Sequence, residues 1–300
     1  MIYGGTTREV FSVAGPGSLK RSPLAKINFF VNVYIRLFAA LFRIPLWFPF
    51  LVLALFQAAI VYALANFYSS SLNGLLYPIL SKFYAPEVFH YPQFFKTLPH
   101  IYSIFNRFLL GPTIGILMTA VAVYKLGGYA VRTKNTFGSG FGKAIRSFFP
   151  LLFIWLLGTI ISVAVLRISA VTLGEYFLSS PRAGLIAGLG FHLFSYLLLA
   201  VILYAVPGII ISGRGLMDSL KFSARIYRSN FFLTFFIIAI PGSIGAIIDL
   251  FIVAFSPQII NLFYPELISV LMMIRIALGI FLNLFLYGAA VFVYSESLNK

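Results

Sequence analysis

Six long apolar stretches constrain this chain more than any other feature of its sequence. A helix needs about 20 apolar residues to cross a hydrocarbon core about 30 Å thick, because each residue advances the helix by about 1.5 Å. Six segments reach that length: 44–67, 101–125, 147–167, 184–211, 231–255 and 267–294. We therefore predict an all-α polytopic membrane protein, with six transmembrane helices in one domain over 24–300 and an N-terminal arm over 1–23.

The composition supports a membrane location. Hydrophobic residues make up 61% of the chain and charged residues only 10%, whereas soluble domains carry about a quarter charged residues. A net charge of +15 would suggest nucleic acid for a soluble protein. Here it is better explained by membrane topology and by attraction to anionic lipid headgroups, so we expect no nucleic-acid partner. The absence of cysteine excludes disulfides and thiolate metal sites.

The basic residues indicate which side each connection faces. They gather before the first span, between the second and third, and between the fourth and fifth, whereas the opposite side holds only Lys82, Lys96, Arg167 and Arg182. Cytoplasmic connections carry the excess of Lys and Arg in membrane proteins. We therefore expect a multi-pass protein of the cell membrane with the arm over 1–23 and both termini in the cytoplasm.

Three of the basic segments resemble one another. Segment 214–229 forms an amphipathic helix with a charged stripe about 80° wide, which suits a helix lying in the membrane plane. Similar basic faces precede the first and third spans. We predict that these cytoplasmic interfacial helices contact lipid headgroups through Arg36, Arg43, Lys143, Arg146, Lys221, Arg225 and Arg228. The pattern is consistent with three parallel repeats, each an interfacial helix and two spans. The alternative is that the positive-inside rule alone produces it.

The region around the fourth connection also resembles a known group. It reads Ala205-Val-Pro207-Gly-Ile-Ile-Ile-Ser-Gly213, then Ser219-Leu-Lys-Phe-Ser223, and Arg225 to Phe231. This resembles a broad group of six-span prokaryotic membrane proteins that includes the membrane domain attached to some glycerophosphodiester phosphodiesterases. The group has Ala where this chain has Ser219, and often an acidic residue near Ser212, which this chain lacks. The resemblance implies the fold type and carries over no activity.

Ionisable residues within the spans are the candidate functional residues, because charges in a membrane are costly and usually functional. Four spans place polar side chains about 9–12 Å from their outer ends, namely Asn106, Arg107, His192, Asp249 and Arg275. One interpretation is a structural ion pair between Asp249 and Arg275. The other is an outward-facing vestibule that binds an anion or relays protons. Asn283 lies deeper, and Pro241-Gly242 predicts a kink or break in the fifth span.

The sequence contains no nucleotide, metal or catalytic motif. We therefore expect no enzyme activity and no cofactor. The function that the sequence favours is a non-catalytic subunit or scaffold of a membrane assembly, with the anionic bilayer, other membrane subunits or a second copy as partners. The alternative is a small permease or channel that uses the outer polar layer.

Overall fold

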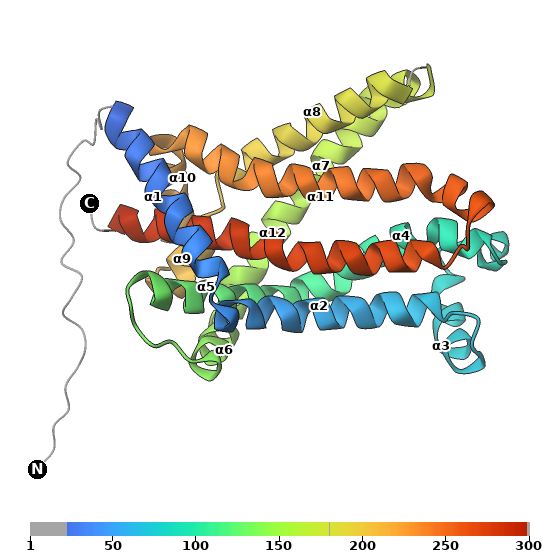
Figure 1. Cartoon of the computed structure of the whole chain (residues 1–300), viewed down its shortest axis with the longest axis horizontal. Coiled ribbons are helices and arrows are strands. Elements are labelled where there is room, and N and C mark those ends of the chain that lie inside the picture. The colour runs from blue at the N-terminus through green and yellow to red at the C-terminus, as the bar shows by residue number, and fades with distance from the viewer. Residues whose placement is uncertain (1–22, 180, 299–300) are drawn as a thin grey trace, which may run out of the picture.

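The computed structural model describes residues 23–179 and 181–298, and most of these residues lie in helices, with no strand among them. Six of their helical segments are long and apolar enough to cross a membrane: Ile44–Ala65, Gln93–Ala130, Phe148–Ile168, Ile186–Ile210, Phe231–Leu262 and Leu267–Leu298. They run lengthwise through an elongated bundle (Figure 1). The predicted all-α, six-span fold is confirmed.

The order of the elements repeats three times. A short helix precedes the first, third and fifth spans: α1 (Pro23–Leu41) before α2 (Ile44–Ala65), α6 (Phe137–Arg146) before α7 (Phe148–Ser179), and α10 (Leu216–Ser229) before α11 (Phe231–Leu262). The second, fourth and sixth spans are α4 (Gln93–Phe105) with η2 (Asn106–Gly115) and α5 (Ile116–Ala130), then α8 (Pro181–Ala200) with α9 (Ala205–Ile210), and α12 (Leu267–Leu298).

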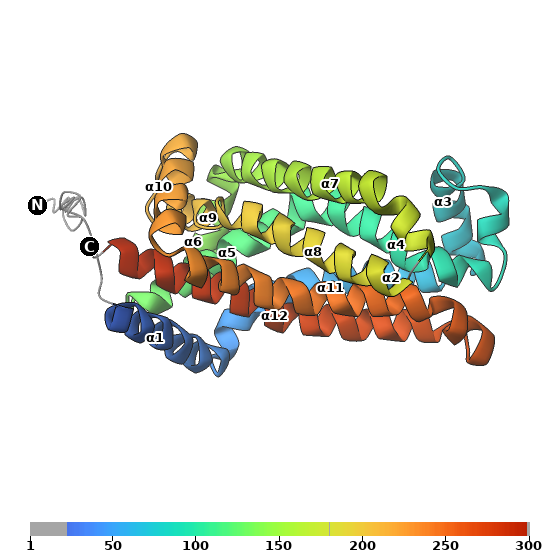
Figure 2. The same ribbon diagram turned by 90° about the horizontal axis from the view of Figure 1, so that it is seen from above.

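The two ends of the bundle differ in character. Figures 1 and 2 place α1, α6 and α10 together at one end, which we call the basic end, because it carries the exposed Arg43, Arg146, Lys221, Arg225 and Arg228. The opposite, far end holds α3 (Ser70–Leu80), η1 (Pro86–Phe89) and the turn between α11 and α12. There the ring of Phe67 stacks on those of Phe89 and Phe94, with centroids 5.6 and 4.5 Å apart. Segment 68–100 therefore forms a folded cap.

Helix α10 packs on the bundle through serines. Ser219 and Ser223 are buried, while Lys221 and Arg225 are exposed on another face. The Ser223 hydroxyl accepts a hydrogen bond from the backbone N–H of Tyr204 at 3.0 Å and donates to the Val201 carbonyl at 2.7 Å. These bonds satisfy backbone groups that the interruption of the fourth span at 201–204 leaves without helical partners.

Helix α1 packs against α12 through Val33, Leu37 and Ala40, which are buried. Arg36 lies beside this contact. Its guanidinium forms an ion pair with Glu296 at 2.7 Å and donates to the Ala130 carbonyl at the end of α5 at 3.0 Å. Arg36 is thus engaged within the protein.

The helices depart from the predicted boundaries in two ways. The fifth span is one continuous helix to Leu262 with Pro241 inside it, so of the kink or break predicted at Pro241-Gly242, the break does not occur. The interruption lies in the fourth span instead, at 201–204. The second span begins as early as Gln93 and is continuous to Ala130, because helix formation continues beyond the most apolar residues.

Candidate functional site

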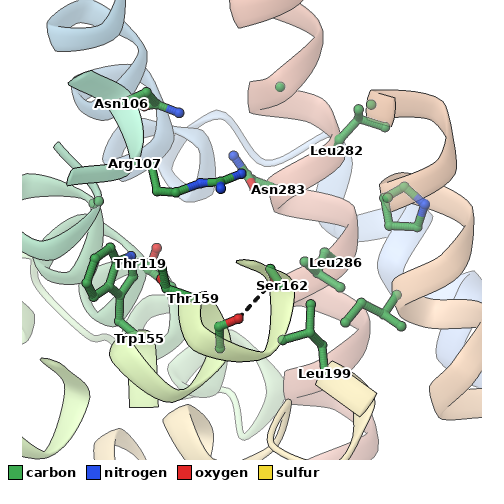
Figure 3. A pocket seen from close by; sticks show the side chains of 18 of the residues that line it. Asn106, Arg107, Thr119, Trp155, Thr159, Ser162, Leu199, Leu282, Asn283 and Leu286 are labelled. Atoms are coloured by element: carbon green, nitrogen blue, oxygen red, sulfur yellow. Dashed lines mark hydrogen bonds between the residues drawn. The ribbon is translucent and has the colours of Figure 1, made fainter. Parts of the chain in front are cut away.

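A cavity of about 820 Å³ lies within the bundle, and all six spans contribute to its lining. This volume falls within the roughly 300–1,000 Å³ of small-molecule sites. The lining runs from Asp249 and Arg275 toward the far end to Leu203, Val206 and Tyr287 toward the basic end. Figure 3 shows its middle, where polar side chains of η2 and α7 face α12.

The polar layer predicted from the sequence meets in this cavity. Asn106, Arg107, His192, Asp249 and Arg275 all line it, and so does the deeper Asn283. On α11, Asp249 lies deeper than the predicted depth of about 9–12 Å from the outer end of its span. It is 13 positions before Leu262 (262 − 249), which is about 20 Å along a helix. Asn106 accepts a hydrogen bond from the Gln57 amide at 2.9 Å, which links α2 to η2.

Asp249 and Arg275 form the predicted ion pair across α11 and α12. Arg275 donates through Nε to Oδ1 at 2.6 Å and through a terminal nitrogen to Oδ2 at 2.7 Å. This two-point geometry fixes the register of the two helices. The side chains remain 28% and 50% exposed, respectively for Arg275 and Asp249, because they line the cavity. The pair is therefore both a structural contact and part of the cavity wall.

Arg107 is different, because no described residue in 23–179 or 181–298 forms a hydrogen bond or an ion pair with its side chain. Its guanidinium extends across the cavity toward Asn283 (Figure 3). An arginine at membrane depth costs about 2.5–3.5 kcal/mol on insertion scales. Water or an anion in the cavity must therefore solvate this group.

Segment η2 carries Arg107 and, at Gly111, lies against the ring of Trp155. Segment η2 is a π-helix, a wider form than the α-helix that is frequent at functional sites. Pro112 within it has no N–H to donate. A Cβ on Gly111 would lie 2.8 Å from the indole Nε1 of Trp155, so only glycine leaves room for the ring there.

Two more side chains are held in place by backbone carbonyls. Nδ1 of His192 lies 2.8 Å from the Gly188 carbonyl, which can only accept, so Nδ1 carries a proton and Nε2 is left for other contacts. The Tyr196 hydroxyl donates to the Gly242 carbonyl at 2.8 Å. A Cβ at Gly242 would lie 2.7 Å from the Tyr196 ring, so this glycine allows α8 to approach α11 closely.

Sequence reasoning missed several residues of the site. Gln57, Thr119, Trp155, Thr159, Ser162 and Tyr196 also line the cavity. One pattern pointed to the α7 members, since Trp155, Thr159 and Ser162 recur at helical spacing and therefore share one face. Their hydroxyl and indole groups are neutral, so a search for ionisable residues within the spans does not select them.

The basic residues form a separate surface. Arg43, Arg146, Lys221, Arg225 and Arg228 are exposed at the basic end. The ammonium of Lys143 lies 5.5 Å from the centre of the Tyr124 ring, and Arg36 is paired with Glu296. Headgroup contact by these residues stays a prediction.

In the described ranges, no group of three His, Asp or Glu side chains is placed to hold a metal ion. Comparison with protein-family models, curated proteins and solved structures gives no match to this chain.

Proposed function

We propose that the protein is a small permease whose substrate site is the central cavity. The observation that carries this proposal is the convergence of all six spans on one cavity that contains Arg107, a cation with no partner in the described ranges. A charge kept at membrane depth without a protein partner is typical of a site that binds or moves a solute.

The scaffold role favoured by the sequence rested on the lack of a ligand constellation inside the bundle. A packed and paired polar layer would support that role, and the pair of Asp249 with Arg275 is of this kind. The cavity around the pair and the free guanidinium of Arg107 favour transport. We further propose a non-catalytic mechanism, since transport requires only binding and a change of access.

The basic end is proposed to face the cytoplasm of the cell, where its exposed arginines and lysines contact anionic headgroups. A layer of fully buried residues separates the cavity from this end, including Leu126, Tyr204 and residues 289–294. Transport then requires this layer to open. The interruption at 201–204, which includes Tyr204, is a suitable hinge, because short non-helical segments absorb the backbone rotation of such motions.

Cysteine labelling tests the proposal directly, because the chain has no cysteine of its own. Thr159→Cys and Asn283→Cys place single thiols in the cavity lining. Leu278→Cys is the control, because Leu278 is 43% exposed on the bundle surface and does not line the cavity. Each variant is reconstituted in vesicles and treated with a membrane-impermeant thiol reagent from one side or the other.

We expect both cavity thiols to react from the far-end side and, more slowly, from the basic-end side as the protein changes access. The Leu278→Cys thiol should not react from either side, because it faces lipid. Unreactive cavity thiols would mean that the cavity is closed to solvent and would refute the proposal. Reaction from one side only would indicate a binding protein and would also refute transport.

A further inference from the structure

The free charge of the cavity is positive. Among the described residues that line it, Asp249 is the single carboxylate, and both of its oxygens accept hydrogen bonds from Arg275. Arg107 has no carboxylate to balance it anywhere in 23–179 or 181–298. The cavity therefore favours a ligand that brings one negative charge.

Hydrogen-bond donors surround the place where that charge would lie. In Figure 3, Asn283 stands opposite the Arg107 guanidinium, while Thr159 and Trp155 lie on the same side of the cavity as Arg107. Amide, hydroxyl and indole groups all donate hydrogen bonds. The forked N–H groups of a guanidinium match the paired oxygens of a carboxylate or a phosphate. The head of the ligand should therefore be one of these two groups.

Beside Asn283, the wall of the cavity across from Arg107 carries apolar side chains. Leu199, Leu282 and Leu286 lie across from the polar residues in Figure 3. A small inorganic anion would leave these leucines against water, whereas an apolar chain would remove their surface from water. The volume of about 820 Å³ accommodates a head and a chain together.

We propose that the cavity binds an amphiphilic anion, with its carboxylate or phosphate head on Arg107 and its apolar chain along Leu199, Leu282 and Leu286. This inference rests on the proposed permease function and names its substrate class. The same head chemistry occurs in a water-borne fatty-acid-like anion and in an anionic lipid of the bilayer.

Binding of three matched probes tests the proposal. The full-length protein is placed in phosphatidylcholine nanodiscs and titrated by calorimetry with decanoate, decanol or acetate, with empty nanodiscs as the blank. Decanoate should bind at least about tenfold more tightly than decanol, which lacks the charge, or acetate, which lacks the chain. Equal affinity for decanol and decanoate would overturn the assignment of the head to Arg107.

A pair of arginine variants locates the head. Arg107→Gln should weaken decanoate binding about 10- to 100-fold, the range expected for lost hydrogen bonds to a charged group. Arg167→Gln is the matched control and should leave the affinity unchanged, because Arg167 is an exposed arginine of α7 outside the cavity. If Arg107→Gln does not fold, Thr159→Val is used, and a several-fold loss is expected. Unchanged affinity in a folded Arg107→Gln variant would overturn the proposal.

A final arm distinguishes the two sources of the ligand. Phosphatidic acid added to the nanodiscs should compete with decanoate if the cavity takes bilayer lipids, and should not compete if it takes only the water-borne anion. Failure of both to bind would overturn the substrate class. If cavity thiols still react from both sides in that case, the permease function stands without this substrate; if they do not react, both proposals fail.

Discussion

Substitution of Asp249 by asparagine tests whether the ion pair inside the cavity stabilises the bundle. The change keeps the size of the side chain and removes one charge, which leaves Arg275 without its two-point partner. Exposed pairs contribute up to about 1 kcal/mol, whereas breaking a buried pair costs about 3–5 kcal/mol. Side-chain exposures of 28% and 50% place this pair between those cases, so we expect a loss of about 2 kcal/mol.

The expected change in melting temperature follows from the length of the chain. For 300 residues, an unfolding entropy of about 2.1 cal/mol/K per residue converts this loss into a decrease of about 3 °C. Thermal unfolding in a mild detergent, followed by circular dichroism, measures it. Glu87→Gln is a suitable control, because Glu87 is exposed in η1 at the far end. The melting temperature of this variant should equal that of the parent protein within experimental error.

A double-mutant cycle then separates the pair from its surroundings. Arg275→Gln alone should also destabilise the protein, and the double variant with Asp249→Asn should lose less than the sum of the two single losses. An unchanged melting temperature in Asp249→Asn, or strictly additive losses, would show that the pair contributes nothing to stability and that the reasoning is wrong.

Three further predictions concern contacts between helices. Gly111→Ala should displace the Trp155 indole, since the new Cβ would lie 2.8 Å from Nε1, and should shift tryptophan emission; an unchanged spectrum would contradict the close contact. Ser223→Ala should cost about 1–3 kcal/mol, because it removes the partner of two backbone groups in the buried region of the fourth span; equal losses in this variant and in the exposed Ser229→Ala would contradict the argument. Glu296→Gln breaks a half-exposed ion pair and should cost only about 0.5 kcal/mol by chemical denaturation; a loss several times larger would mean that the pair anchors α1.

The number and type of the spans could be predicted from the sequence because hydropathy acts over about 20 residues at a time. Asp249 and Arg275 could be paired in advance because each is a charge in an apolar helix and the two spans are consecutive. The same reasoning brought Asn106, Arg107 and His192 to one layer, where the structure shows them lining one cavity. The cavity between these side chains could not be predicted.

The cavity depends on side-chain contacts that one-dimensional patterns do not contain. Pro241-Gly242 predicted a kink or a break in the fifth span; α11 is continuous, and the irregular backbone lies at η2 and at 201–204. A proline removes one donor, but whether the helix breaks depends on neighbours that satisfy the freed groups. The serines of α10 show the same limit. Ser219 and Ser223 lie between the apolar groups of this amphipathic helix, and Ser223 is a buried contact because it bonds the backbone of the interrupted fourth span.

The buried core of the bundle is divided into two clusters. One buried apolar cluster lies toward the basic end and includes Leu37, Tyr204 and Tyr294. A second lies toward the far end and includes Phe67 and Ile268. Helix α7 joins the first cluster through Leu151 and Ile154, which also line the cavity. Trp155 packs against the same cluster and borders the cavity near Arg107. The part of the cavity wall that lies beside Arg107 is therefore continuous with the packed core of the basic end.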